Sequence, residues 1–127
     1  MNDVVAPVPI LAEAVAALRE RTVKPSELVF ASIERCRELN PRINAFTVVD
    51  EQAAMREAEA ADARYLRGEP YSLFDGLPIG VKDNIDVAGM PTSNGIAKGP
   101  ASSEDAPVIA ALKASGAIML GKLNMHE

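Results

Sequence analysis

The stretch FDGLPIGVKDNIDVAGMPTSNG, residues 74–95, decides how the rest of the chain is arranged, because it places a lysine directly after an apolar run. Leu77–Val81 predicts a short strand that is buried on both faces, bounded by Asp75-Gly76 and by Asp83-Asn84. Lys82 then ends a buried strand, where desolvation disfavours the ammonium form. Lys82 is therefore a candidate for a depressed pKa and for base chemistry as a neutral amine.

A simpler interpretation of the same spacing is that Lys82 ends an ordinary strand at the protein surface. Its ammonium would then pair with the carboxylate of Asp83 or Asp86. Spacing alone favours this interpretation, because most lysines near carboxylates are structural or simply exposed. Asp83 and Asp86 could themselves form an acid/base pair. We expect instead that Asp83 helps to orient the turn and Lys82, and that Asp86 caps or solvates the strand end.

Two long motifs add information that spacing does not give: GLPIGVKDNIDVAGMPTSNG (residues 76–95) and EDAPVIAALKASGAIMLGKLNMHE (residues 104–127). They resemble the N-terminal part of the amidase signature family, whose members hydrolyse or transfer amides with a serine, a cis-serine and a lysine. The resemblance covers the chain from about Leu11 to Glu127. It implies that Lys82 is the catalytic lysine, which accepts a proton from the bridging serine so that the other serine can attack the amide and form an acyl-enzyme. It also implies that both serines lie in a Gly/Ser-rich segment beyond Glu127, so we expect these 127 residues to be inactive alone.

Periodicity outside the central stretch indicates an α/β chain. Helices are predicted at residues 10–21, from Pro25 to a stop at Asn40-Pro41, at 51–67 with Asp50 as cap, and from Glu104-Asp105 to Ser115-Gly116; strands are predicted at 45–49, 77–81, 85–87 and 117–120. The order strand, helix, strand predicts a right-handed crossover and a parallel pairing. The resemblance implies the N-terminal part of an α/β/α fold with helices packed on a mixed or parallel sheet. We treat residues 1–127 as one partial domain, in which 1–68 is mainly helical and 69–127 runs strand, loop, helix, strand.

The segment from Gly89 to Ser103 is rich in glycine, proline, serine and asparagine. A loop this long inside a compact chain is usually either a binding element or disordered. Composition leaves both open, whereas the resemblance implies that the loop lies near the active site.

Composition and charge exclude several classes of protein. The 127 residues, 48% of them hydrophobic, suffice for one modest domain, and the net charge of −5 argues against a nucleic-acid-binding face. The single cysteine, Cys36, excludes an internal disulfide and indicates a reducing, cytoplasmic setting. Residues 1–10 contain an acid and no positive region, and Glu13 interrupts the next apolar stretch, so we predict no signal peptide and no membrane span. The oligomeric state stays open, with a homodimer as one option.

Two patterns point weakly towards cofactors. Gly116–Lys122 fits the first seven positions of a phosphate-binding P-loop, but Leu123 stands where a magnesium-binding Ser or Thr is needed, and Ala117–Leu120 reads as a strand. His126-Glu127 begins a zinc-protease motif with no second histidine. We therefore predict no cofactor and no metal site.

After Arg67 the only cations in the sequence are Lys82, Lys98, Lys113 and Lys122. Lys113 fits the last turn of a helix, where a positive charge is favourable.

Several functions remain open. The leading hypothesis is an amidase acting on a small-molecule amide. A close alternative is the amidotransferase subunit that amidates aminoacyl-tRNA, which shares the KDN and GKLNM patterns, although VAGMPTSNG is more similar to the general amidases. A non-catalytic remnant or interaction domain would expose an apolar sheet edge. A nucleotide-binding module that uses Gly121-Lys122 is the weakest alternative.

Overall fold

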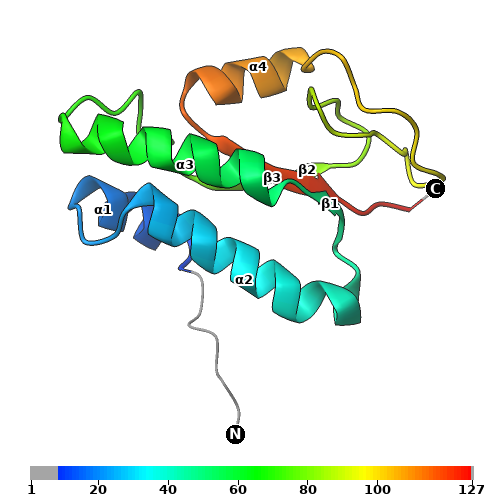
Figure 1. The fold of residues 1–127 in the computed structure, drawn as a ribbon, viewed down its shortest axis with the longest axis horizontal. Coiled ribbons are helices and arrows are strands. Elements are labelled where there is room, and N and C mark those ends of the chain that lie inside the picture. The colour runs from blue at the N-terminus through cyan, green and yellow to red at the C-terminus, as the bar shows by residue number, and fades with distance from the viewer. Residues whose placement is uncertain (1–8, 127) are drawn as a thin grey trace, which may run out of the picture.

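The computed structural model describes residues 9–126 and shows a three-stranded sheet with helices on both of its faces (Figure 1). The elements are α1 (Leu11–Arg19), α2 (Pro25–Ile43), β1 (Phe46–Val49), α3 (Glu51–Leu66), β2 (Pro78–Lys82), α4 (Pro107–Ala114) and β3 (Ile118–Leu123). The strand order is β1-β3-β2, with β2 parallel and β1 antiparallel to the central strand β3. The predicted α/β class, the mixed sheet and the parallel pairing across α4 are confirmed.

The central strand β3 supplies both halves of the hydrophobic core. Ile118 and Leu120 are buried against α2 and α3, whereas Ala117 and Met119 are buried with Ile109 of α4. This is the alternation expected of a strand covered on both faces, because successive side chains point to opposite sides of the sheet. Helices α2 and α3 thus form one outer layer and α4 the other (Figure 1).

Helix α3 packs closely on α2 because its inner face carries small residues. Ala54, Ala58 and Ala61 are the buried residues of this face. The carboxylate of Asp50 accepts a hydrogen bond from the Ala53 amide at 3.1 Å, which confirms the predicted N-cap.

A buried ion pair fastens the connection between α3 and β2. Arg64 donates from Nε and Nη2 to the two carboxylate oxygens of Asp75 at 2.8 and 2.7 Å, and Asp75 is fully buried. The guanidinium also lies 4.1 Å from the centre of the Tyr71 ring. The two parallel hydrogen bonds fix the turn from which β2 starts.

Some predicted boundaries are wrong. Helix α2 does not stop at Asn40-Pro41 but continues to Ile43, with Asn44 in the left-handed conformation as its C-cap. The proline lies in the last turn, where its missing N–H costs a single helical hydrogen bond. Asn40 compensates by bonding the backbone N–H and C=O of Phe46, which ties the helix end to β1.

The second half of the chain also departs from expectation. Residues 85–87 form no strand, and α4 begins at Pro107 because the Asp105 carboxylate bonds the Ala88 amide and Lys113 and so does not cap the helix. Strand β3 extends to Leu123 and therefore contains Lys122. As a result the buried lysine of this chain is Lys122, not Lys82.

The prediction that the apolar run is buried on both faces, and buries Lys82, is wrong for the described residues. Pro78, Ile79 and Gly80 are half-buried and Lys82 is exposed. The physical reason is that β2 is an edge strand of this sheet, so only β3 covers it laterally.

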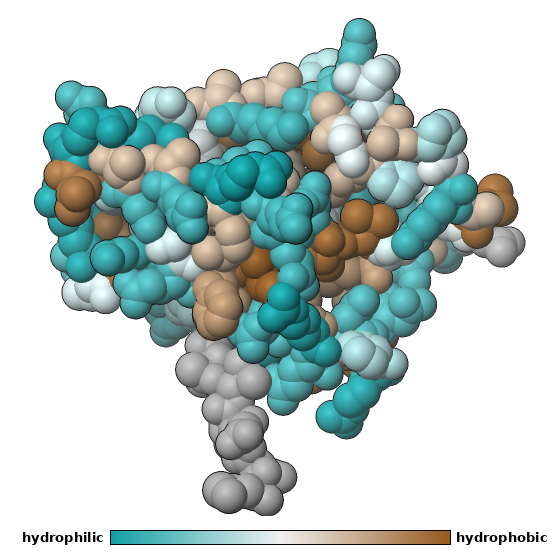
Figure 2. All heavy atoms as spheres, in the orientation of Figure 1, coloured by the Kyte–Doolittle hydropathy of each residue, from teal (hydrophilic) through white to brown (hydrophobic). Residues whose placement is uncertain are grey.

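The surface adds little to the assignment of function. Figure 2 shows that polar and charged side chains dominate one face, with smaller groups of hydrophobic residues between them. No helix within residues 9–126 is both long and apolar enough to cross a membrane. The expectation that the chain starts without a signal peptide falls largely on residues 1–8, outside the described range.

Gly116 offers a test of the packing between α4 and β3. Its φ is +92°, and a Cβ there would overlap the Asp75 carboxylate and lie 2.8 Å from Asp75 Cα. We expect Gly116→Ala to lower the free energy of unfolding by about 3 kcal/mol, since backbone strain and a clash in a packed site add. Urea denaturation measures this change in the free energy of unfolding.

The matched control is Gly89→Ala. Gly89 has a similar φ of +86°, but no atom lies within 4 Å of the added Cβ. Gly89→Ala should therefore lower the free energy of unfolding only through the strain of the left-handed conformation, by about 1 kcal/mol. Equal losses in the two variants would contradict the steric role of the Asp75 contact.

Candidate functional site

The polar centre of the structure lies at the carboxyl ends of β2 and β3. Val81 pairs with Lys122 across the parallel ladder, and Asp83 follows directly after β2. This register brings Lys122 Nζ to 3.2 Å from Asp83 Oδ1. The side chains are 0% and 1% exposed, respectively, so the two opposite charges are both removed from water.

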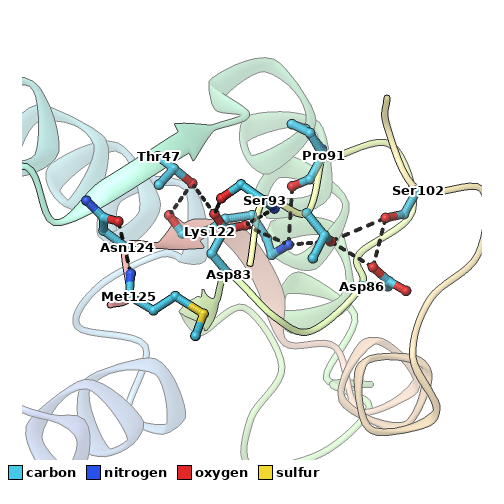
Figure 3. Close-up of polar contacts among 10 residues, drawn as sticks. Thr47, Asp83, Asp86, Pro91, Ser93, Ser102, Lys122, Asn124 and Met125 are labelled. Atoms are coloured by element: carbon cyan, nitrogen blue, oxygen red, sulfur yellow. Dashed lines mark hydrogen bonds and ion pairs between the residues drawn. The ribbon is translucent and has the colours of Figure 1, made fainter. Parts of the chain in front are cut away.

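The loop that follows β2 wraps this ion pair (Figure 3). Lys122 Nζ donates to Thr92 Oγ1 at 2.9 Å and to the Pro91 carbonyl at 3.3 Å. Ser93 donates to Asp83 from both its hydroxyl and its amide. The segment 89–103 is thus held at the site through specific hydrogen bonds, and its role in binding stays a prediction.

A second carboxylate continues the network outwards. Thr92 Oγ1 donates to Asp86 Oδ1 at 2.7 Å, and Ser102 Oγ donates to the same oxygen at 3.1 Å (Figure 3). These two hydroxyls hold the pKa of Asp86 below its usual range. Asp86 therefore stays a carboxylate near neutral pH, which does not suit a general acid.

Opposing effects act on the pKa of Asp83. Burial disfavours the carboxylate, but the hydrogen bonds from Ser93 and the Lys122 ammonium outweigh it, so the pKa lies below its ordinary value of 3.8. Thr47 of β1 adds a hydroxyl at 3.3 Å from Asp83 Oδ2. The prediction that Asp83 orients the turn agrees with these contacts, whereas the suggested pairing with Lys82 does not occur.

Lys82 lies on the other side of the sheet from this network. Because Lys82 pairs with Leu123 and Val81 with Lys122, strand alternation puts Lys82 on the face opposite Lys122. No ion pair among residues 9–126 includes Lys82. Its catalytic role stays a prediction, and the apolar run that was expected to bury it leaves Lys82 exposed in the described part of the chain.

One hollow borders the sheet, and another lies within the loop. An apolar groove of 390 Å³ lies between α1, α2 and the sheet, with Leu28, Cys36 and Gly80 among its lining residues. A polar hollow of 500 Å³ is formed by the loop, with Asp86 and Ser102 among its lining residues. In the described part of the chain, Lys82 is not a lining residue of either hollow.

The remaining candidates carry no chemistry in this structure. Burial raises the pKa of the Cys36 thiol, and the nearby Glu51 carboxylate raises it further, so this cysteine is a poor nucleophile. Within residues 9–126 no three His, Cys, Asp or Glu side chains gather as metal ligands. Gly121 and Lys122 belong to β3 and the lysine is buried, so the P-loop interpretation of Gly116–Lys122 is wrong.

Comparison with known proteins agrees with this fold. The Amidase family model matches residues 27–127. The chain belongs to the amidase family. It is 42% identical over 119 residues to the A-type subunit of the glutamyl-tRNA(Gln) amidotransferase of Anaeromyxobacter sp. (strain K), covering 92% of this chain and 24% of that protein. It is 38% identical over 117 residues to the indoleacetamide hydrolase of Bradyrhizobium diazoefficiens, covering 88% and 22%.

Solved structures place the same fold in other amidases. The peptide amidase from Stenotrophomonas maltophilia superimposes with a TM-score of 0.85 at 29% identity, covering 94% of this chain and 26% of that one. A crystal structure described as an amidase gives a TM-score of 0.81 at 36% identity, covering 92% of this chain and 27% of that one. The chain spans about a quarter of the length of the relatives it matches.

The Lys122–Asp83 pair can be tested through pH. A carboxylate whose folded-state pKa is depressed stabilises the protein above its unfolded pKa, and the contribution is lost as the pH falls through the folded value. We expect Asp83→Asn to cost about 3 to 5 kcal/mol at pH 7, because it leaves the buried Lys122 without its partner. The difference from the wild type should shrink as the pH falls below 3.8, the ordinary value, and through the lower folded-state pKa of Asp83.

Urea denaturation at a series of pH values measures this difference. Asp86→Asn is the control, because that carboxylate is exposed and hydrogen-bonded only to hydroxyls among the described residues. It should destabilise the protein much less than Asp83→Asn. A cost for Asp83→Asn that stays constant from pH 7 to the acid range would contradict the depressed pKa.

Proposed function

We propose that the protein to which these residues belong hydrolyses the amide bond of a small-molecule amide through an acyl-enzyme. Membership of the amidase family and similarity to hydrolases of amides support this proposal. The observation that carries it is Lys82, which occupies the VKD motif at the carboxyl end of a parallel strand. In open α/β sheets, this end of the strands is where substrates bind.

The proposed role of Lys82 is to accept a proton. It would take that proton from a bridging serine, which in turn activates a nucleophilic serine to attack the amide carbonyl and expel the amine. Both serines are proposed to lie outside residues 1–127, as the resemblance implies. Arginine could not replace Lys82, because a guanidinium does not deprotonate in proteins.

A lysine acts as a base near neutral pH only if its pKa falls by several units from about 10.4. Lys82 is exposed among the described residues. The proposal therefore requires that another part of the fold covers this lysine. The edge position of β2 leaves room for such a cover.

Three accompanying proposals follow from the sequence. The 127 residues make up part of one amidase-signature domain, they need no cofactor or metal for this chemistry, and they work in a reducing, cytoplasmic setting. The last proposal is supported by the single cysteine, which excludes an internal disulfide.

A second candidate function is amide transfer by a subunit of an aminoacyl-tRNA amidotransferase. The 42% identity to such a subunit favours it. The two functions differ in what they require: a hydrolase acts on simple amides by itself, whereas a transferase subunit depends on partner subunits and charged tRNA. Release of ammonia from a simple amide without any partner would favour the hydrolase.

The first experiment is to read the codons that follow Glu127. A Gly/Ser-rich segment there would supply the serines, and the protein that contains it should release ammonia from simple amides such as indoleacetamide. In that protein we expect Lys82→Ala and Lys82→Arg to lower kcat/KM by at least about a thousandfold, because both remove the proton acceptor. The measurement is steady-state ammonia release.

The control is Lys24→Ala, which removes an exposed lysine at the start of α2, in the turn between α1 and α2. It should leave kcat/KM unchanged. The 127-residue chain alone should show no turnover. Turnover by the chain alone, or full activity of Lys82→Ala, would show that the proposed division of roles is wrong.

A further inference from the structure

The buried pair Lys122–Asp83 has no part in the proposed proton transfer, yet it is next to the residue that does. Asp83 follows Lys82 in the chain, and Lys122 is opposite Val81 in the ladder. Both side chains are almost completely buried. Removing two charges from water costs several kcal/mol per ion, so such a pair needs compensating hydrogen bonds.

These hydrogen bonds come from two separate segments, strand β1 and the loop. Thr47 of β1 and Ser93 of the loop bond Asp83, while Thr92 and the Pro91 carbonyl bond Lys122. Every buried side-chain nitrogen or oxygen among the described residues has a partner. The pair therefore joins β1, β3 and the loop at the point where β2 ends.

The backbone of Asp83 is fixed by the same arrangement. Its amide donates to the Leu123 carbonyl at 2.9 Å, and its carbonyl accepts from the Asn94 amide at 3.0 Å. The two peptide units that flank the Asp83 Cα are thus both held, and the first of them is the one that follows Lys82. A positioned strand end in turn limits where the Lys82 side chain can reach.

We propose that Lys122 is a positioning residue that acts through Asp83: the pair anchors the end of β2 beside Lys82 while adding no net charge there. This inference rests on the proposed function where it concerns catalysis. The effect of the pair on the charge near Lys82 does not depend on that function. A carboxylate alone would serve as an anchor too, but its negative charge would favour the ammonium form of Lys82 and oppose its use as a base. Lys122 cancels that charge.

Among the described residues, few other charged groups lie near the Lys122–Asp83 pair. Asp83 faces Lys122 of β3, the uncharged Thr47 of β1 and the uncharged Ser93 of the loop. The loop also brings the Asp86 carboxylate to Thr92, which separates it from Lys122. On the α4 side, Lys113 pairs with Asp105 at 2.9 Å and so forms its own neutral pair.

The experiment follows the titration of the Lys82 amine in the 127-residue chain by NMR with isotope-labelled lysine. The chain has five lysines, and the Lys82 signal is assigned by its loss in Lys82→Arg. Lys122→Met leaves Asp83 ionised and uncompensated, so it should raise the titration midpoint of Lys82. For an assumed separation of roughly 8 Å, a unit charge gives a rise of about 0.4 to 1.5 pH units at effective dielectric constants of about 80 to 20.

The matched variant is Lys122→Met combined with Asp83→Asn. It removes both charges and should return the midpoint to within about 0.2 pH unit of the wild type. A merely structural role predicts no such return. A neutral replacement of a buried ion pair usually folds, so this double variant remains informative if Lys122→Met alone unfolds.

Two outcomes would overturn the proposal. The first is an unchanged Lys82 midpoint in folded Lys122→Met. The second is a midpoint in the double variant that differs from the wild type by more than about 0.4 pH unit. Either would show that the pair does not control the charge felt by Lys82.

Activity forms a separate readout. If the protein hydrolyses amides, the acid limb of its kcat/KM profile should shift to higher pH in Lys122→Met and return in the double variant. If amide hydrolysis is absent altogether, the proposed function fails while the NMR result still decides the anchor. The two failures are therefore distinguishable.

Discussion

The structure depends on one buried ion pair at the carboxyl edge of its sheet. Lys122 and Asp83 lie 3.2 Å apart with almost no exposure to water. Because buried charges are stable only when they are paired and hydrogen-bonded, the surrounding hydroxyls and carbonyls cannot be arranged freely. The course of the loop after β2 follows from this requirement, since Pro91, Thr92 and Ser93 supply most of the partners.

The same logic appears at the opposite end of β2. Arg64 and the fully buried Asp75 hold the turn that precedes the strand, and Gly116 is required where the β3 side of the chain approaches Asp75. The two ends of β2 are thus fastened by polar pairs, while its middle packs through apolar side chains such as Val81. An edge strand with few apolar neighbours gains its fixed position from these pairs.

Much of the fold could be predicted from local patterns. The Asp50 cap and the parallel pairing of β2 with β3 both depend on short-range sequence signals, and they are confirmed. The exposure of Lys82 could not be predicted in this way, because it depends on whether another strand covers β2. Sequence periodicity does not show which strand lies at the edge of a sheet.

Lys122 shows the same limit of local patterns, because they did not single it out as the buried lysine. Lys122 follows an apolar run just as Lys82 does, so both lysines carried the same local signal. What separates them is strand order: β3 lies between β1 and β2, and Lys122 is covered on both faces, whereas Lys82 ends an edge strand. The signal that could have distinguished them is the carboxylate at Asp83, whose position one residue after Lys82 puts it on the face of Lys122. A buried lysine therefore marks the centre of this sheet, and the exposed lysine beside it marks its edge.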